Sequence, residues 1–339
     1  MSILSRRRPR RYSASAGLPF DDDELEARLI WIWTSARSGS TWLLRLLSHP
    51  LRLVDGSQSS DDMLGFRVPE RSPAPVDVIP VDTTFLANHL SPLARSEPYD
   101  ETYAPVTFGT FPGMAGRPNY FFSSKYEDVW RPELRRLALV RFHAMIERAA
   151  ALHEVADPRV ILKEVAGAHA ADRVMSLFPR SRLIFLVRDG RDVVDSQVDA
   201  NRSEAWLPTA AGFADEAARL EFVRERSRAW VGDVLTIQRA FAAHPHELRY
   251  TIRYEDLLED TPAALGALVE WLGLERGAGW LERAVETKAF ANVPAERKGP
   301  KKFYRAATPG FWKTSLTPAE QEVANEAMGE KLSELGYAT

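Results

Sequence analysis

The residues Thr34-Ser35-Ala36-Arg37-Ser38-Gly39-Ser40-Thr41-Trp42 follow an apolar run at positions 29–33 and lead into a helix-like segment at positions 42–47. A strand that ends in a Ser- and Gly-rich turn and opens a helix points several backbone N–H groups, and the positive end of the helix dipole, at one place. This stretch therefore predicts a strand–turn–helix unit that binds an anion. An ordinary joint between a strand and a helix is the alternative for the segment taken alone.

The residues of this turn differ from those of an ATP-binding loop. Such a loop has the pattern G-x-x-x-x-G-K-S/T. This chain has Thr34 at the first glycine and Ser40 at the lysine, and its cation is Arg37, inside the turn. The departures disfavour an ATP-type triphosphate site.

A second segment has the same form. Residues 181–187 predict a short buried strand, which leads into Arg188-Asp189-Gly190-Arg191-Asp192-Val193-Val194-Asp195-Ser196. Asp189 or Asp192 is expected to serve the start of a helix. In that helix Ser196 lies two turns beyond Arg188, about 12 Å at most by helix rise. A phosphate group can be approached by both side chains.

Together the two segments resemble the sulfotransferases that use 3′-phosphoadenosine 5′-phosphosulfate as donor. Their first motif is roughly T-x-P-K/R-S-G-S/T-T-W/L, and their second is R-D/N-x-x-D-x-x-x-S. The resemblance implies that Arg188 and Ser196 bind the 3′-phosphate of the donor. It also implies that the first turn binds the 5′-phosphosulfate through Arg37, Ser38, Gly39, Ser40, Thr41 and Trp42.

Two further matches extend this resemblance over most of the chain. Tyr254-Glu255-Asp256-Leu257 is similar to the family's Y-E-D segment, which implies that Tyr254 lies near the adenine. Arg297, Lys298 and Gly299 match an R-K-G that wraps the 3′-phosphate, and a G-x-W-K match follows at residues 310–313. Residues 300–308 separate the two pieces more widely than in the cytosolic animal enzymes. Arg305, in this stretch, is an alternative cation for the same phosphate.

Buried strands that alternate with helices predict an α/β fold, a three-layer sandwich with a mainly parallel central sheet and helices on both faces. The ligand of such a sheet lies at the carboxyl ends of its strands, where both phosphate motifs are expected. The resemblance implies the P-loop-NTPase-like sulfotransferase fold. The apolar spacing predicts a helix over residues 131–155, a short strand at residues 160–162, and further helices over residues 213–242 and 265–272.

The chain has 339 residues, enough for one sizeable core, and we divide it into a disordered basic tail at residues 1–24 and a single domain at residues 25–339. Residues 66–126 hold nine of the 22 prolines and many aromatic residues. A long insert of this kind predicts the lid and wall of an acceptor pocket. A local mini-core that covers a sheet edge is the alternative.

Composition excludes several classes of protein and site. The net charge of −3 gives no global bias toward nucleic acid. The absence of cysteine excludes disulfides and thiolate chemistry and suits a reducing cytoplasm, where we expect the protein. The seven histidines show no metal-binding spacing, so no metal is expected. There is no run of eighteen apolar residues, hence no membrane span, and no apolar segment of an export signal follows the arginines at positions 6–11.

Sulfo transfer resembles phosphoryl transfer in needing cations that position and stabilise charged oxygens. We expect Arg37 to bind the bridging oxygen as it gains charge, with Lys163, which ends the strand at residues 160–162, as a second cation. A solvated strand end is the alternative for Lys163. The family has a lysine at the corresponding place.

A general base must take the proton of the acceptor. Sulfotransferases use a histidine, whose place is taken here by Val165, or a glutamate, whose place is taken by Thr83. His89 is the first candidate for the base because its ordinary pKa lies near neutrality. Asp82 comes second, and Glu164 and His169 follow. A structural role is the alternative for His89.

The sequence therefore predicts a sulfotransferase that moves a sulfo group from 3′-phosphoadenosine 5′-phosphosulfate to a hydroxyl or amine of a small molecule and releases adenosine 3′,5′-bisphosphate. The aromatic residues of the insert suit an apolar or ring-bearing acceptor. A small-molecule kinase on a P-loop-like fold and a non-catalytic nucleotide-binding relative are the alternatives. The acceptor, the oligomeric state and the pathway are not indicated by the sequence.

Overall fold

Five parallel strands form the central sheet of the computed structural model, which describes residues 21–50, 52–53, 66–67, 76–82, 124–152, 155–165, 167–205 and 212–338. The spatial order of the strands is β4-β5-β1-β6-β7, and each neighbouring pair is parallel. Their bounds are Leu29–Trp33 for β1, Val76–Asp82 for β4, Val155–Glu164 for β5, Arg182–Val187 for β6 and Arg249–Arg253 for β7. A separate antiparallel pair joins β2 (Arg52–Leu53) to β3 (Phe66–Arg67).

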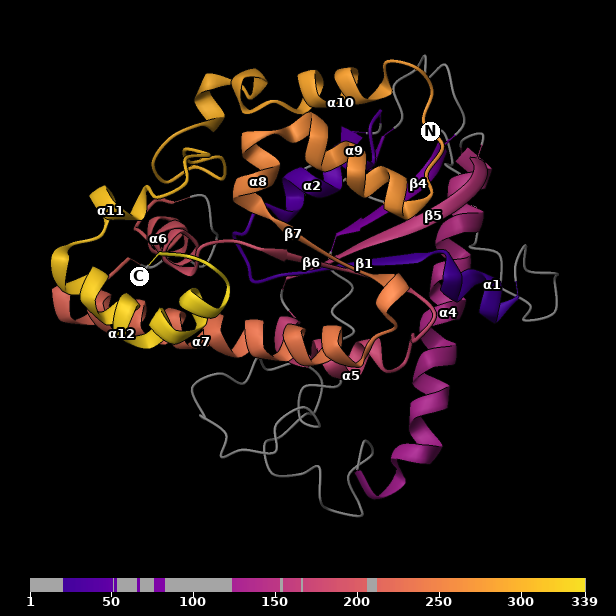
Figure 1. The fold of residues 1–339 in the computed structure, drawn as a ribbon, viewed down its shortest axis with the longest axis horizontal. Helices are drawn as coiled ribbons and strands as arrows, with labels where there is room; N and C mark the ends of the chain where they lie inside the picture. Colours follow the sequence, from indigo (N-terminus) through magenta and orange to yellow (C-terminus); the bar gives the residue numbers. More distant parts are fainter. Residues whose placement is uncertain are drawn as a thin grey trace, which may run out of the picture.

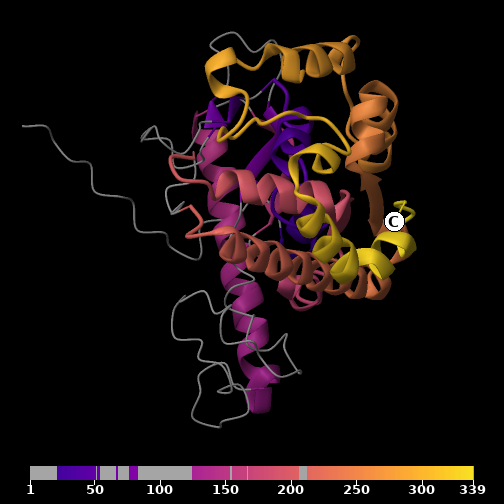
Figure 2. The ribbon, with the colours of Figure 1, turned by 90° about the vertical axis from the view of Figure 1, so that its left-hand side faces the viewer.

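Helices cover both faces of the sheet (Figure 1). One layer contains α2, α8, α9 and α10, with bounds Ser40–Leu47, Tyr254–Glu259, Thr261–Leu272 and Trp280–Lys288. The opposite layer contains α4, α5, α7 and α12, with bounds Glu127–Leu152, Ala171–Met175, Glu216–Ala243 and Pro318–Glu334. The remaining helices are α1 (Asp22–Ala27), α6 (Gly190–Ala200) and α11 (Trp312–Ser315). Figure 2 shows the long helix α4 projecting beyond the sheet.

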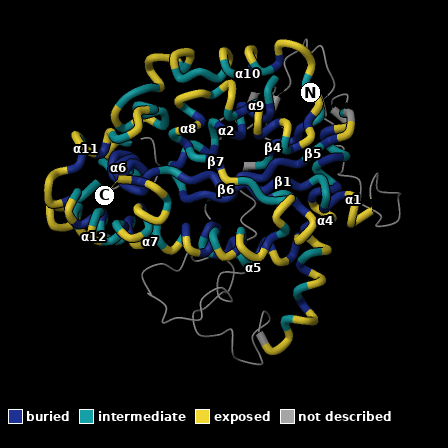
Figure 3. The backbone as a smooth tube through the Cα atoms, in the orientation of Figure 1, coloured by how far each residue is buried: buried dark blue, intermediate teal, exposed yellow. Residues whose placement is uncertain are grey.

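Side-chain alternation along β1 divides the core between the two layers. Trp31 and Trp33 pack into the cluster that contains α4, α5, α7 and α12, whereas Ile30 and Ile32 pack into the cluster that contains α2 and α8–α10. Every residue of β1 is buried, and β1 is dark blue in Figure 3. Burial on both faces explains why the strand is a continuous apolar run rather than an alternating one.

The predicted α/β sandwich with a mainly parallel sheet is confirmed. The strand at residues 160–162 is longer than predicted because β5 lies between β1 and β4 and pairs with both. The predicted helix at residues 131–155 begins earlier, at Glu127, and ends at Leu152. Of the described helices, none is both long and apolar enough to cross a membrane.

Two predicted segments differ in the structure. Asp21 caps α1 with a reciprocal capping box to Glu24, so this helix begins before the predicted boundary at residue 25. The insert at residues 66–126 is not irregular throughout, because its residues 76–82 form β4, the edge strand of the main sheet. Pro80 is compatible with an edge strand, where one side needs no N–H donor. The rest of the insert lies largely outside the described residues.

Candidate functional site

The turn between β1 and α2 has an unusual backbone. Arg37 and Gly39 both have positive φ, 77° and 88°, and Gly39 is the N-cap of α2. A Cβ atom on Gly39 would lie 2.4 Å from the Tyr254 ring, so only glycine fits this close approach. The buried Ser38 hydroxyl has no hydrogen-bond partner within the described part of the chain. This turn therefore combines a strained, closely packed backbone with a buried polar atom that is available to a ligand.

The Arg37 side chain crosses from this turn to two distant segments. Its Nε donates to the Ser196 hydroxyl at 3.1 Å, and its Nη2 donates to the Phe303 carbonyl at 2.7 Å. Its guanidinium also lies 4.8 Å from the centre of the Phe303 ring. Burial, and next the positive charge of Arg188, lower the pKa of Arg37 to about 10. Arg37 is therefore still a cation at neutral pH, within a cationic surrounding.

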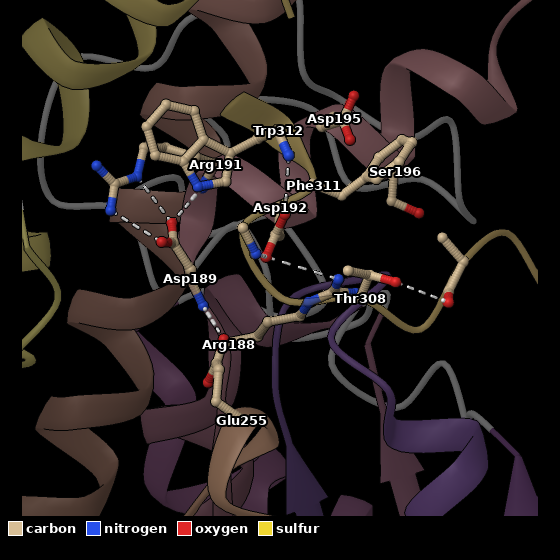
Figure 4. Close-up of polar contacts among 12 residues, drawn as sticks. Arg188, Asp189, Arg191, Asp192, Asp195, Ser196, Glu255, Thr308, Phe311 and Trp312 are labelled. Carbon is tan, nitrogen blue, oxygen red and sulfur yellow. Dashed lines mark hydrogen bonds and ion pairs between the residues drawn. The ribbon is translucent and has the colours of Figure 1, made fainter. Parts of the chain in front are cut away.

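Arg188 lies where β6 joins α6. Its Nη1 donates to the Arg37 carbonyl at 3.0 Å, and its guanidinium lies 4.5 Å from the centre of the Tyr254 ring. Asp189 is the N-cap of α6, so the first of the two predicted capping aspartates takes this role. The Asp189 N–H donates to the Glu255 carboxylate at 3.0 Å (Figure 4). These contacts join the β1 turn, the start of α6 and the start of α8 into one unit.

Lys163 reaches the same place from β5. It lies beside Ile32 of β1 in the parallel register, and its Nζ donates to the Thr41 hydroxyl at 3.0 Å. The side chain is buried. Lys163 is thus directed at the first turn of α2 rather than into solvent, which disfavours the alternative of a solvated strand end.

Residues 299–312, which we call the strap, pass along α6. Three buried aspartates of α6 hold it at successive points. Asp199 accepts from the Lys301 N–H at 2.8 Å, and Asp195 accepts from both terminal nitrogens of Arg305, at 3.1 Å for Nη2. Asp192 accepts from the N–H groups of Gly310 and Trp312, at 2.7 and 3.2 Å (Figure 4). Burial raises the pKa of Asp192, and the nearby Arg188 and these N–H donors oppose that shift.

A cavity of about 340 Å³ lies between these elements. Among the described residues that line it, five are cations and two, Asp192 and Asp195, are carboxylates. The cations are Arg37, Lys163, Arg188, Lys288 and Arg305. The described lining also contains six aromatic residues, namely Trp42, Tyr254, Phe290, Phe303, Tyr304 and Phe311. Excess positive charge beside aromatic walls suits an anion that carries a ring system.

Most of the predicted site residues meet at this cavity although they come from different elements. The ones that line it are Arg37, Gly39, Ser40, Thr41, Trp42, Lys163, Arg188, Ser196 and Tyr254. Ser38 lies buried within the same turn. The parallel sheet explains the convergence, because it brings the carboxyl ends of β1, β5, β6 and β7 to one edge.

Arg297, Lys298 and Gly299, which were predicted to bind the 3′-phosphate, are not among the residues that line the cavity. Gly299 donates its N–H to the Tyr304 carbonyl at 2.9 Å, and Lys298 Nζ donates to the Ala291 carbonyl at 2.8 Å. The Arg297 guanidinium lies over the Tyr304 ring at 5.5 Å. The triplet therefore contacts Tyr304 and Ala291, whereas the strap residues that line the cavity come later, from Phe303 onward.

The candidates for the base are only partly described. His89 and the side chain of Asp82 lie outside the described residues. Glu164 and His169 are described, and neither lines the cavity. Glu164 follows Lys163 in β5, and alternation along the strand turns it away while Val165 faces the cavity.

Part of the cavity wall was not predicted from the sequence. The residues concerned are Lys288, Phe290, Phe303 and Tyr304. In this part of the chain, only the R-K-G and G-x-W-K motifs and Arg305 indicated a function. The density of aromatic and basic residues there was the available signal. Asp195 was also missed, because a carboxylate beside an anion site has no local sequence signature.

A family model described as “Sulfotransferase family” matches residues 30–277. No curated protein matches the chain. Among solved structures, the mouse sulfotransferase SULT7A1 complexed with PAP is 13% identical, with a TM-score of 0.52 over 91% of this chain and 87% of that chain. A retinol dehydratase in complex with androsterone and inactive cofactor PAP is 14% identical, with a TM-score of 0.45 over 91% and 81%. STF9 from Mycobacterium avium is 15% identical, with a TM-score of 0.47 over 92% and 77%. At 13% identity, the likeness to the mouse enzyme shows the shared fold.

Proposed function

Because this chain belongs to the sulfotransferase family, we propose that it transfers a sulfo group from 3′-phosphoadenosine 5′-phosphosulfate to a hydroxyl or amine of a small molecule. The observation that carries the proposal is that the β1 turn, Lys163, Arg188 and Ser196 line one and the same cavity. Its excess of cations matches a donor with several anionic groups, and its aromatic wall matches an adenine ring.

The residues present fit such a donor. The Ser38 hydroxyl is buried without a partner within the described chain, and Gly39 lets the Tyr254 ring pack closely against the same turn. We assign the 5′-phosphosulfate to residues 37–42 and the 3′-phosphate to Arg188 and Ser196. Tyr254, which contacts Arg188 and Trp42 by its ring, is assigned to the adenine end.

When bound, the donor supplies the sulfo group and a phosphate leaving group. The chain supplies charge and orientation. Arg37 and Lys163 are the cations at the β1 turn, and we assign them the stabilisation of the negative charge that develops on the bridging oxygen. Arg37 also contacts Ser196 of α6 and Phe303 of the strap, so a role in binding the donor is the alternative.

The acceptor and the base complete the proposal. We keep His89 as the first candidate for the group that takes the acceptor proton and Asp82 as the second, both from the insert. Glu164 and His169 rank lower because neither side chain reaches the cavity. The aromatic residues of the insert support an apolar or ring-bearing acceptor. Ring-bearing phenols and alcohols are therefore the acceptors that we propose to screen first.

Two experiments test the proposal against its alternatives. A ligand that binds only the folded protein raises the melting temperature. Adenosine 3′,5′-bisphosphate should therefore stabilise the chain more than ATP with Mg²⁺; the reverse order would favour the kinase. Transfer of label from 35S-labelled donor to a panel of phenols and alcohols should then be detected. Binding of the bisphosphate without transfer to any acceptor would favour the non-catalytic relative.

A further inference from the structure

The contacts of Arg305 differ from those of the other cations at the cavity. Its two terminal nitrogens bind the Asp195 carboxylate, its Nε lies 3.9 Å from the Asp199 carboxylate, and its guanidinium lies 4.7 Å from the centre of the Phe311 ring. The side chain is 12% exposed. The carboxylate fixes one edge of the planar group and the ring covers one face, so its orientation is set before any ligand binds.

Arg305 also lies beside the residues assigned to the 3′-phosphate. Asp195, its partner, directly precedes Ser196 on α6. Arg305 and Arg188 both repel the charge of Arg37, whose Nε contacts Ser196. Three guanidinium groups, those of Arg37, Arg188 and Arg305, thus line the cavity that Ser196 also lines, and two of them repel the third. A phosphate dianion is the group that best relieves such crowding of positive charge.

We propose that Arg305, held in place by Asp195, binds the 3′-phosphate of the donor in place of the Arg297-Lys298-Gly299 triplet and selects nucleotides that carry this phosphate. The inference rests on the proposed function, because it concerns the same donor. Arg305 is the binding residue, and Asp195 is a positioning residue that acts through it.

The arginine has hydrogen-bonding capacity left for this role. A guanidinium has five N–H donors in a fixed fork, and the two contacts with Asp195 use two of them. Arg297, by contrast, is exposed and lies outside the cavity lining. A nucleotide that lacks the 3′-phosphate forgoes the contact with Arg305, so the residue contributes selectivity rather than general affinity.

The role of Asp195 predicts an effect opposite in sign to simple electrostatics. A carboxylate near a phosphate repels it, so Asp195→Asn would strengthen phosphate binding if the charge alone mattered. If Asp195 positions Arg305, the same substitution weakens binding because the guanidinium loses its fixed orientation. The sign of the change therefore separates a positioning residue from a neighbouring negative charge.

The experiment is isothermal titration of the full chain with adenosine 3′,5′-bisphosphate and with adenosine 5′-phosphate. Loss of one charge-assisted contact corresponds to about 10- to 100-fold in affinity. Arg305→Gln should weaken the bisphosphate by that factor and the monophosphate little, with Arg305→Lys between the two. Asp195→Asn should weaken the bisphosphate selectively. The double variant should be no weaker than Arg305→Gln alone, because Asp195 acts only through Arg305.

Two further arginine variants complete the test. Arg224→Gln, on α7 and paired with Glu221, is the matched control and should change neither ligand. Arg297→Gln tests the alternative phosphate-binding residue. If it weakens binding of the bisphosphate selectively while Arg305→Gln does not, the inference is overturned. Unchanged or tighter bisphosphate binding by Asp195→Asn overturns the positioning role. The monophosphate affinity reports folding of each variant.

Titration of the wild-type protein distinguishes a wrong donor from a wrong role for Arg305. If it binds both nucleotides equally, the proposed donor is wrong and the inference is overturned with it. If it selects the bisphosphate and Arg305→Gln keeps that selectivity, only the inference fails.

Discussion

The Tyr337 hydroxyl donates a hydrogen bond of 2.9 Å to one oxygen of the Glu255 carboxylate, and the other oxygen accepts from the Asp189 N–H at 3.0 Å. A residue near the end of the described chain is thereby tied to the start of α6, next to Arg188. Burial, and next the Glu255 charge, raise the pKa of Tyr337, so its hydroxyl keeps its proton and remains a donor. The start of α6 is thus tied, through Glu255, to a residue 82 positions further along the chain.

Tyr337→Phe should lower the free energy of unfolding by about 1–2 kcal/mol, because the half-buried Glu255 carboxylate loses a hydrogen bond and the ring is retained. Urea unfolding measures the change as a lower midpoint with an unchanged m-value. Tyr126→Phe, at a residue that is 49% exposed, is the control and should have little effect. Equal stability of Tyr337→Phe and the wild type would show that the network adds nothing to the fold.

Arg188→Ala should weaken adenosine 3′,5′-bisphosphate more than adenosine 5′-phosphate, by about 1.5–3 kcal/mol for the lost charge-assisted contact. The substitution also removes the bond to the Arg37 carbonyl, so a smaller loss is expected for both ligands. Titration calorimetry provides the two affinities. Equal weakening of both nucleotides would remove Arg188 from the 3′-phosphate site.

Arg37→Ala should reduce the turnover number more than it reduces donor affinity, since its charge is needed most as the bridging oxygen becomes negative. Lys163→Ala should show the same pattern less severely. Steady-state kinetics with varied donor separates the two parameters. A variant with an intact turnover number and only a raised KM for the donor would make Arg37 a binding residue, as its contacts with Ser196 and Phe303 also permit.

His89→Ala should cost about 10²- to 10⁴-fold in turnover with a weakly acidic alcohol, the usual effect of losing a general base. The loss should be smaller with an acidic phenol that is already partly ionised. The rate should rise with pH through the ordinary pKa of imidazole, and the variant should lack this rise. Asp82→Asn and Glu164→Gln are the matched controls. A carboxylate is the base if one of them abolishes the rise while His89→Ala preserves it.

His49 should make the fold sensitive to acid. Burial, and next the positive charges of Lys288, Arg283 and Arg276, lower the pKa of His49 to about 4, and its buried Nδ1 has no partner in the described chain. The unfolded chain, with an ordinary pKa near 6.5, binds a proton first. The contribution of His49 to stability is therefore complete above about pH 6.5 and is lost as the pH falls toward 4.

His49→Phe, which keeps a ring beside Trp280, should flatten the dependence of unfolding free energy on pH between about 6.5 and 4. Urea unfolding at several pH values measures the slope. The assignment to His49 fails if the variant and the wild type lose stability equally across this range.

The local chemistry of the chain could be predicted from the sequence. A glycine between small polar residues, after five apolar residues, specifies a strand, a tight turn and a helix start, because each depends on neighbouring residues alone. The capping of α6 by Asp189 is likewise local, because its carboxylate accepts from the N–H of Arg191, two residues further on. The alternation of such units with helices then gives a parallel sheet and places both phosphate motifs at one edge. β4 was missed because its seven residues lie within a segment whose many prolines suggested an irregular loop.

The arrangement of the strap was decided by the tertiary structure alone. Arg305 and Asp195 are 110 residues apart, and Arg37 and Phe303 are 266 apart. Neither pair has a sequence pattern, because hydrogen bonds between such distant residues form only when the segments that carry them pack together. The R-K-G triplet has a pattern, yet it does not line the cavity, whereas Arg305 does. Residue type and local spacing therefore determined which strand–turn–helix units the chain contains, whereas packing determined which cations line the cavity.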